Sequence, residues 1–240
     1  PRTRPIMAPR AAVALDGSQR RLVPGDFAYA EVKKLDPDNQ GQVWCDIKPG
    51  RPVEIASQVL RVTAPNPGMM TGPGTNTYLI GNAETGIALI DPGPLLDEHI
   101  AAIEQNAAGQ IKWILCTHTH IDHSPAARVL REKHGATVYG MPPPPYPNQD
   151  QTFAPDQVVQ NGDRINVAGI TLRVIHTPGH ASNQVCYFWE TERLLFTGDH
   201  IMQGSTVVIN PPDGHMATYL ASLRLLQSEN IDYLAPGHGF

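Results

Sequence analysis

The segment CTHTHIDHSP, residues 116–125, constrains the fold of this chain more than any other stretch. It places three histidines and one aspartate within six positions, directly after the apolar run IKWIL. Because alternate residues of an extended chain point the same way, His118 and His120 at a strand end can direct both imidazoles at one metal ion. If the chain then enters a helix, Asp122 and His123 lie at its start and can reach a second point nearby. The segment therefore predicts a strand, a tight turn and a helix, with metal ligands at the turn.

Apolar runs of two kinds surround this segment. Runs of alternating, β-branched or aromatic residues predict strands at residues 58–64, 75–81, 87–93, 111–118, 136–141 and 231–239. Runs with helical spacing predict helices at residues 95–108, 124–135 and 216–230. In the second helix, Ser124 is expected at the N-cap and Gly135 at the stop.

The second half of the chain opens with two predicted hairpins. Residues 163–180 are expected to turn at Ala168-Gly169, and residues 184–200 at Glu190-Thr191-Glu192. The proline-rich stretch 142–156 precedes them and is expected to be a loop, because proline fits neither helix nor sheet interiors. Strand–helix alternation followed by hairpins indicates two packed sheets with helices outside.

The chain is long enough for one domain with a well-buried core, at 240 residues. Residues 1–56 show weak periodicity and scattered Pro, Gly and Arg, so we expect an N-terminal extension there, with a short hairpin near residues 41–47. Residues 57–240 are expected to form the domain that carries the motifs.

Charge and cysteine content narrow the class of protein. The formal net charge of −5 does not favour nucleic-acid binding, although residues 1–34 hold seven Lys or Arg against three Asp or Glu. Three isolated cysteines argue against a disulfide framework and a thiolate zinc cluster, and favour a cytoplasmic protein. Cys116 and Cys186 lie in apolar runs and are expected to be buried. No long apolar run or signal-like segment is visible, so no membrane association is expected.

The turn at residues 116–125 cannot complete a metal site alone, because zinc typically binds about four ligands. Three further stretches each place a polar ligand next to Gly or Pro where a predicted strand ends. They are HTPGH ending at His180, FTGDH carrying Asp199, and APGHG carrying His238. An HExxH zinc helix, a GxSxG elbow and a P-loop are absent from the sequence.

One allocation of these residues completes two adjacent metal sites. The first ion takes His118, His120 and His180. The second ion takes Asp122, His123 and His238, with Asp199 bridging the two ions. Nitrogen and oxygen ligands without a thiolate favour two Zn(II) ions, with iron or manganese as alternatives.

With these motifs, residues 58–240 resemble the metallo-β-lactamase superfamily. The resemblance implies an α+β fold, a four-layer αββα sandwich with a dinuclear site at one edge of the two sheets. The stretches NPGMMTGPGTNTYLIG and TGDHIMQGSTVVINPPDG are most similar to the β-lactamase-like protein 2 and glyoxalase II-like branch. Aspartate rather than cysteine at position 199 fits that branch better than the antibiotic-degrading β-lactamases. Relatives of this type commonly continue past the APGHG loop into a further helix and a winged-helix module, so we expect a sequence that ends at Phe240 either to be truncated or to lack that module.

The resemblance implies hydrolysis by a metal-bridging hydroxide, with Asp122 binding a metal and serving as the catalytic proton carrier. The expected substrate is a small ester, thioester or lactone, which the acidic main domain favours. Single-stranded RNA is the alternative, favoured by the subgroup and by the basic N-terminal stretch. The complete second site argues against an iron-dependent persulfide dioxygenase, and an open site argues against a scaffold role. The sequence leaves a homo-oligomer open.

Several side chains near the motifs are expected to border or support the site. Asn76 and His215 are predicted to contact substrate, whereas Tyr78 is expected to pack within its strand. Asp91 is expected to orient a ligand histidine. Four further histidines are given structural or solvated roles: His176 and His200 as hydrogen-bonding neighbours of the ligands, and His99 and His134 as solvated helix residues.

Overall fold

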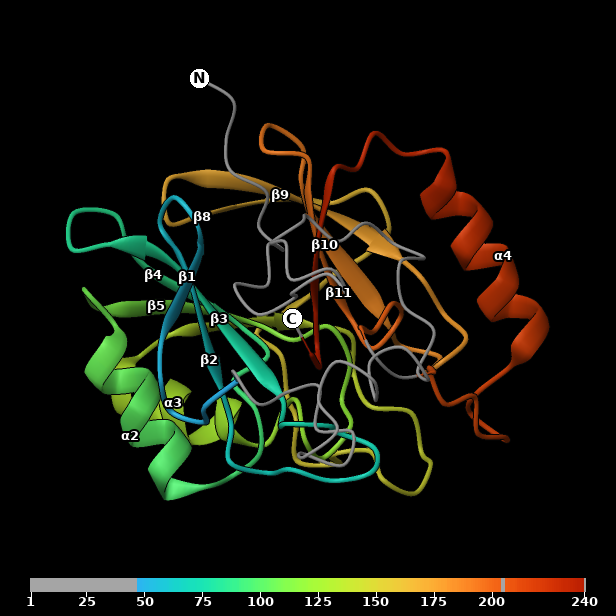
Figure 1. Cartoon of the computed structure of the whole chain (residues 1–240), viewed down its shortest axis with the longest axis horizontal. Helices are drawn as coiled ribbons and strands as arrows, with labels where there is room; N and C mark the ends of the chain where they lie inside the picture. Colours follow the sequence, from blue (N-terminus) through green and yellow to red (C-terminus); the bar gives the residue numbers. More distant parts are fainter. Residues whose placement is uncertain (1–46, 204–205, 240) are drawn as a thin grey trace, which may run out of the picture.

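The computed structural model describes residues 47–203 and 206–239, and these residues form two β-sheets and three helices (Figure 1). The first sheet contains, in order, Val53–Ala56 (β1), Val59–Thr63 (β2), Asn76–Asn82 (β3), Gly86–Ile90 (β4), Ile111–Leu115 (β5), Thr137–Gly140 (β6) and Gln157–Val158 (β7). The second sheet runs in the order β12-β11-β10-β9-β8 and contains Arg164–Val167 (β8), Ile170–His176 (β9), Val185–Trp189 (β10), Leu194–Gly198 (β11) and Tyr233–Pro236 (β12). The helices are Asp97–Asn106 (α2), Ala126–His134 (α3) and Met216–Gln227 (α4).

The main apolar core lies between the two sheets. Tyr187 and Phe196 from the second sheet are fully buried there. Tyr78 on β3 meets the Phe196 ring edge-on, with ring centroids 5.2 Å apart, and donates its hydroxyl proton to the Pro236 carbonyl at 2.7 Å. The predicted packing role of Tyr78 is therefore confirmed. Truncating a buried ring of this kind typically costs about 3–5 kcal/mol, so this layer holds the two sheets together.

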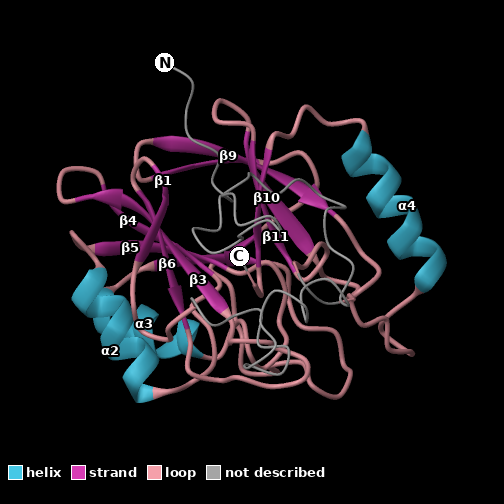
Figure 2. Ribbon diagram, viewed as in Figure 1, coloured by secondary structure: helices cyan, strands magenta, loops and turns pink. Residues whose placement is uncertain are grey.

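The helices cover the outer faces of the sheets. Ile103 of α2 and Leu130 of α3 pack with Leu89 and Ile114 on the first sheet. Leu226 of α4 packs against the second sheet in a separate cluster. Figure 2 shows α2 and α3 on one side of the molecule and α4 on the opposite side. The expected α+β sandwich with four αββα layers is confirmed.

The strands, the helices and the two hairpins predicted from residue 58 onward are present within a few residues of their expected limits. Ala168 and Gly169 have φ values of 49° and 79°, the two left-handed residues of a tight hairpin turn. Gly135 ends α3 at φ 67°, as expected. The expected N-cap at Ser124 is wrong: Pro125 occupies that position, and the Ser124 hydroxyl instead donates to Asp150 Oδ2 at 2.9 Å.

The N-terminal extension predicted for residues 1–56 lies mostly outside the described residues, as does most of the hairpin predicted near residues 41–47. Its last part, Val53–Ala56, is described as β1 and pairs with β2. The division between an extension and a domain at residue 57 stays a prediction. Within the described ranges, no helix is both long enough and apolar enough to cross a membrane.

His99 is the main correction to the predicted environments. It was expected to be solvated, yet it is fully buried, and its Nε2 donates to Thr77 Oγ1 at 2.8 Å. Gly93 makes this burial feasible, because a Cβ there would lie 2.8 Å from His99 Nε2. His134 is half-buried and pairs with Glu104 at 2.8 Å. The expected burial of Cys116 and Cys186 is confirmed.

Burial of His99 predicts a pH-dependent contribution to stability. Burial lowers the pKa of His99 to about 4, from 6.5 for an exposed histidine. The unfolded chain therefore binds a proton on His99 more readily than the folded chain does. Burial of the neutral ring consequently favours the folded state fully above pH 6.5, and this contribution to the unfolding free energy is lost as pH falls toward 4. Between pH 7 and pH 5, the unfolding free energy of the unchanged protein should fall by about 1–2 kcal/mol more than that of His99→Gln. Urea unfolding at both pH values measures the difference, with His176→Gln as control. Equal losses in His99→Gln and in the unchanged protein would contradict the prediction.

Candidate metal centre

The loops that follow four strands bring the seven predicted ligands together. The loop after β5 carries four of them and runs into α3, while the loops after β9, β11 and β12 each add one. The ligand atoms fall into three overlapping groups, each within 4.8 Å: His118, His120 and His180; His118, His123 and Asp199; Asp122, His123 and His238. Residues spread over more than 100 positions of the sequence thus meet at one edge of the two sheets.

Three histidines form the first group. His120 Nδ1 lies 3.0 Å from His118 Nε2 and 3.0 Å from His180 Nε2. Nitrogens bound to one tetrahedral zinc ion at about 2.05 Å lie roughly 3.3 Å apart. The spacing of this group is therefore close to that of three ligands on one ion.

The other ligands form a second group of two imidazoles and two carboxylates: His123, His238, Asp122 and Asp199. His123 Nε2 lies 3.4 Å from Asp122 Oδ2 and 3.3 Å from Asp199 Oδ1. His238 Nε2 lies 3.3 Å from Asp122 Oδ2 and from Asp199 Oδ2. Asp199 Oδ2 also lies 3.6 Å from His180 Nε2, so this carboxylate spans both groups.

Acceptors behind the rings set the tautomers of four histidines. Nδ1 of His123, His180 and His238 faces Asp91 Oδ2 at 3.0 Å, the Val208 carbonyl at 2.7 Å and the Gly74 carbonyl at 3.2 Å, respectively. These oxygens only accept, so each Nδ1 carries a proton and each Nε2 is the ring nitrogen that faces the cluster and can bind a cation. His118 follows the same rule, because the Thr117 hydroxyl donates to Asp91 and must accept from His118 Nδ1.

Converging ligand atoms are the observation that tests the fit of a metal ion. His123 Nε2 and Asp199 Oδ1 are buried and 3.3 Å apart, and neither forms a hydrogen bond with the described residues. Buried polar atoms left in this state are costly, and a cation between them would satisfy both. Imidazole nitrogens and carboxylate oxygens without thiolate are the donor set of zinc and of non-haem iron. The residues present therefore fit metal ions at this position.

The electrostatics of the cluster keep its carboxylates ionised. Burial by itself would raise the pKa of Asp122 and Asp199, but the neighbouring His123 and His238 lower both well below the usual range. Burial and nearby histidines lower the pKa of His120 to about 4, so its ring is neutral near pH 7. In the metal-free state the two carboxylates raise the pKa of His238 to about 9 despite its burial. A bound cation would displace that proton.

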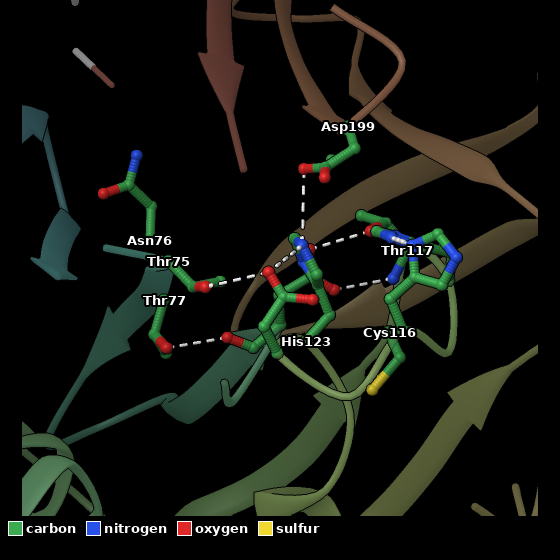
Figure 3. A network of polar contacts seen from close by, with 12 residues as sticks. Thr75, Asn76, Thr77, Cys116, Thr117, His123 and Asp199 are labelled. Atoms are coloured by element: carbon green, nitrogen blue, oxygen red, sulfur yellow. Dashed lines mark hydrogen bonds and ion pairs between the residues drawn. The ribbon is translucent and has the colours of Figure 1, made fainter. Parts of the chain in front are cut away.

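Asp91 was expected to orient one ligand histidine, and the structure places it behind two of them. It ends β4 with φ 50°, a left-handed conformation that non-glycine residues rarely adopt. Its carboxylate accepts from the Thr117 amide at 2.7 Å, the Thr117 hydroxyl at 2.8 Å and His123 Nδ1 at 3.0 Å. Figure 3 shows Thr117, His123 and Asp199 within this network.

Thr75 and Gly237 shape the second group and were not predicted to do so. The Thr75 hydroxyl donates to Asp122 Oδ2 at 3.3 Å (Figure 3). At Gly237 a Cβ would lie 2.4 Å from Asp199 Oδ1, so only glycine fits beside the carboxylate. The glycine of APGHG was the available sequence signal, since a Gly next to a ligand marks close backbone approach. No signal pointed to Thr75.

The two predicted substrate contacts do not border the pocket. Asn76 is fully buried and donates from Nδ2 to the carbonyls of Pro236 and Gly239, at 3.0 and 2.9 Å, so it holds the His238 loop. His215 is exposed and caps α4, where it accepts from the Thr218 amide at 3.3 Å. Of the neighbouring histidines, His176 bonds the Ser182 carbonyl at 3.0 Å as expected, whereas His200 is buried against the Tyr219 ring.

A pocket of about 430 Å³ opens over the cluster. Its floor contains Asp122, His120, His180, Asp199 and His238. Its walls consist of Met70, Thr71, Ile121, Tyr146, Pro147, Asn148, Met202, Val208, Asn210, Pro211, Pro212 and Asp213. The walls are mainly apolar, and none of these described residues is Lys or Arg. A neutral, largely apolar ligand suits such a pocket better than a phosphate chain.

The chain is similar to known proteins in sequence and in fold. The model of the metallo-beta-lactamase superfamily matches residues 70–238. The atrochrysone carboxyl ACP thioesterase dmxR1 of Cryptosporiopsis sp. is 29% identical over 91% of this chain and 67% of its own length. Thioesterase pkgB of Emericella nidulans is 35% identical over 75% of this chain and 50% of its own. The solved structure of TTHA1623 in a di-iron-bound form has a TM-score of 0.59 and 27% identity, over 75% of this chain and 92% of that one. The chain spans between half and about two thirds of the length of the curated relatives it matches.

Thr117 offers a test of how the ligands are held. Thr117→Val keeps the side-chain shape but removes the hydroxyl that links His118 to Asp91. We expect the affinity for Zn(II) to fall about 10- to 100-fold, as for other contacts behind metal ligands. Competition with a chromophoric chelator measures the affinity. Thr171→Val is the matched control, since its exposed hydroxyl bonds only Asn166. An unchanged affinity in Thr117→Val would rule out this orienting role.

Proposed function

We propose that this chain, which belongs to the metallo-beta-lactamase superfamily, is a hydrolase that cleaves an acyl thioester at a centre of two metal ions. The observation that carries the proposal is the convergence of imidazole nitrogens and two carboxylates at an apolar pocket. The proposed ligands are His118, His120, Asp122, His123, His180, Asp199 and His238.

The thioester class comes from the relatives. Both dmxR1 and pkgB are named as thioesterases, and the name of dmxR1 specifies an acyl carrier protein as the group that holds the acyl chain. An apolar pocket of about 430 Å³ is large enough for an acyl group. RNA, the alternative substrate, gains no support from the pocket, because phosphate binding depends on Lys and Arg contacts.

Zinc is the proposed metal, with iron as the alternative that the di-iron-bound TTHA1623 structure suggests. When bound, the ions supply Lewis acidity toward the thioester carbonyl and lower the pKa of water. The side chains behind the histidines fix the ring positions before substrate enters, so the chain holds its donors pre-organised.

Asp122 is the proposed proton carrier. Its side chain is 23% exposed and lines the pocket, whereas that of Asp199 is only 8% exposed. The Thr75 hydroxyl and His238 Nε2 each lie 3.3 Å from Asp122 Oδ2 and fix its orientation. We propose that this carboxylate accepts a proton from the attacking water and delivers it to the leaving thiolate sulfur.

The substrate proposal is tested by a panel of reactions. Initial rates of the zinc-loaded protein are compared on N-acetylcysteamine thioesters, aryl esters, lactones and a short single-stranded RNA, with His238→Ala as the control for contaminating activity. We expect thioester hydrolysis that a strong chelator abolishes and added Zn(II) restores. RNA cleavage that disappears in His238→Ala, without thioester turnover, would replace this proposal with the ribonuclease alternative.

The proton role is tested by Asp122→Asn. We expect kcat for thioester hydrolysis to fall by about 100-fold or more, because the amide cannot accept a proton. Metal content is measured on the same samples by atomic emission. If activity declines only in proportion to the metal lost, Asp122 serves as a ligand alone.

A further inference from the structure

Two loops form much of the pocket wall, and each is attached to a ligand-bearing segment. Residues 146–148 line one part, and the Asn148 carbonyl accepts from the Ile121 amide at 3.1 Å, beside His120. Residues 210–213 line another part, and the same loop reaches His180 through the Val208 carbonyl. The width of the pocket therefore depends on how far apart these two loops are held.

Gln149 joins the two loops directly. Its Nε2 donates to Asp213 Oδ2 at 2.9 Å, and its Oε1 accepts from the Thr119 hydroxyl at 2.5 Å. Thr119 in turn accepts from Asn183 Nδ2 at 2.7 Å, so its proton is directed at Gln149 and the amide has one orientation. Only 6% of Gln149 is exposed.

Asp213 uses both carboxylate oxygens in this arrangement. Its Oδ1 accepts from the Ser182 amide at 3.0 Å, two residues after His180. Hydrogen bonds thus run from Thr119, between two candidate ligands, through Gln149 and Asp213 to the loop of a third. We call the Gln149–Asp213 hydrogen bond the clasp.

We propose that the clasp is the specificity-determining contact of the pocket, which limits the width of the apolar acyl group that can reach the candidate metal centre. The inference rests on the proposed thioesterase function and adds the selection of its acyl group. Gln149 and Asp213 are positioning residues, since they act on substrate through the loops that they join.

The pocket wall supplies the chemical class of that acyl group. Met70 and Ile121 are each 57% exposed, and Val208 is 37% exposed, so apolar surface is available at the pocket. None of the described residues that line the pocket is Lys or Arg, so a negatively charged acyl group finds no cationic partner in the wall. An uncharged aliphatic or aromatic acyl group fits both conditions.

The test exchanges the two partners of the clasp. Gln149→Glu alone sets two carboxylates against each other and should force the loops apart. The double variant Gln149→Glu/Asp213→Asn restores one hydrogen bond with its direction reversed. Gln160→Met, an exposed glutamine outside the pocket, is the control. Asp213→Ala breaks the clasp from its more exposed side and serves if Gln149→Glu does not fold.

The readout is the ratio of kcat/KM for 2-naphthoyl and butanoyl thioesters of N-acetylcysteamine, with zinc content measured for each variant. We expect Gln149→Glu and Asp213→Ala to raise this ratio about tenfold. The double variant should return it close to the value of the unchanged protein. An unchanged ratio in folded, fully zinc-loaded Gln149→Glu or Asp213→Ala overturns the proposal.

A binding measurement separates this proposal from the proposed function. Calorimetry is performed with ketone analogues in which a methylene group replaces the thioester sulfur. A protein that hydrolyses no thioester refutes the proposed function. In that case the affinities of Gln149→Glu and of the unchanged protein are compared for each analogue. A gain for the naphthoyl analogue about tenfold larger than for the butanoyl analogue still supports the clasp, and equal changes for both analogues overturn it.

Discussion

The carboxylate of Asp91 is the contact on which the candidate metal centre depends most. It stands where β4 ends, in a left-handed conformation that costs free energy, and it accepts three hydrogen bonds. Through Thr117 it sets the tautomer of His118, and directly it sets that of His123. One buried anion therefore orients a ring in each of the two proposed metal sites, and ties the end of β4 to the turn after β5.

Residues of the first sheet also hold His238, the last metal ligand along the chain, which follows a strand of the second sheet. His238 follows β12, yet its loop is fixed by residues of β2 and β3. Asn76 Nδ2 and the Tyr78 hydroxyl donate to carbonyls at 236 and 239, and Arg61 Nη1 donates to the Gly239 carbonyl at 3.1 Å. The proposed dinuclear site consequently needs the two sheets in a fixed relative position, because its ligands follow strands of both sheets and residues of the first sheet hold the loop of His238.

Different residues hold the proposed metal ligands and the loops of the pocket. Contacts behind the rings, through Asp91, Thr117 and Gly74, govern how well a cation is held. Contacts through Gln149 and Asp213 govern the loops above it. A superfamily that accommodates many substrates on one fold can vary the second set while it keeps the first, since fold alone does not define the substrate.

The sequence by itself determined the element order, the hairpin turns and the seven clustered side chains. Period-two and period-3.6 patterns, glycines and motif spacing are local properties that survive without knowledge of the fold. Only the tertiary structure decided the roles of Asn76, His99 and His215. The local sequence pattern is the same whether such a residue contacts substrate or solvent, or has the role found here. Those roles are a buried asparagine that holds a loop, a histidine that packs on a glycine and a histidine that caps a helix. What distinguishes them is the partner, and each decisive partner of Asn76 lies about 160 residues away along the chain.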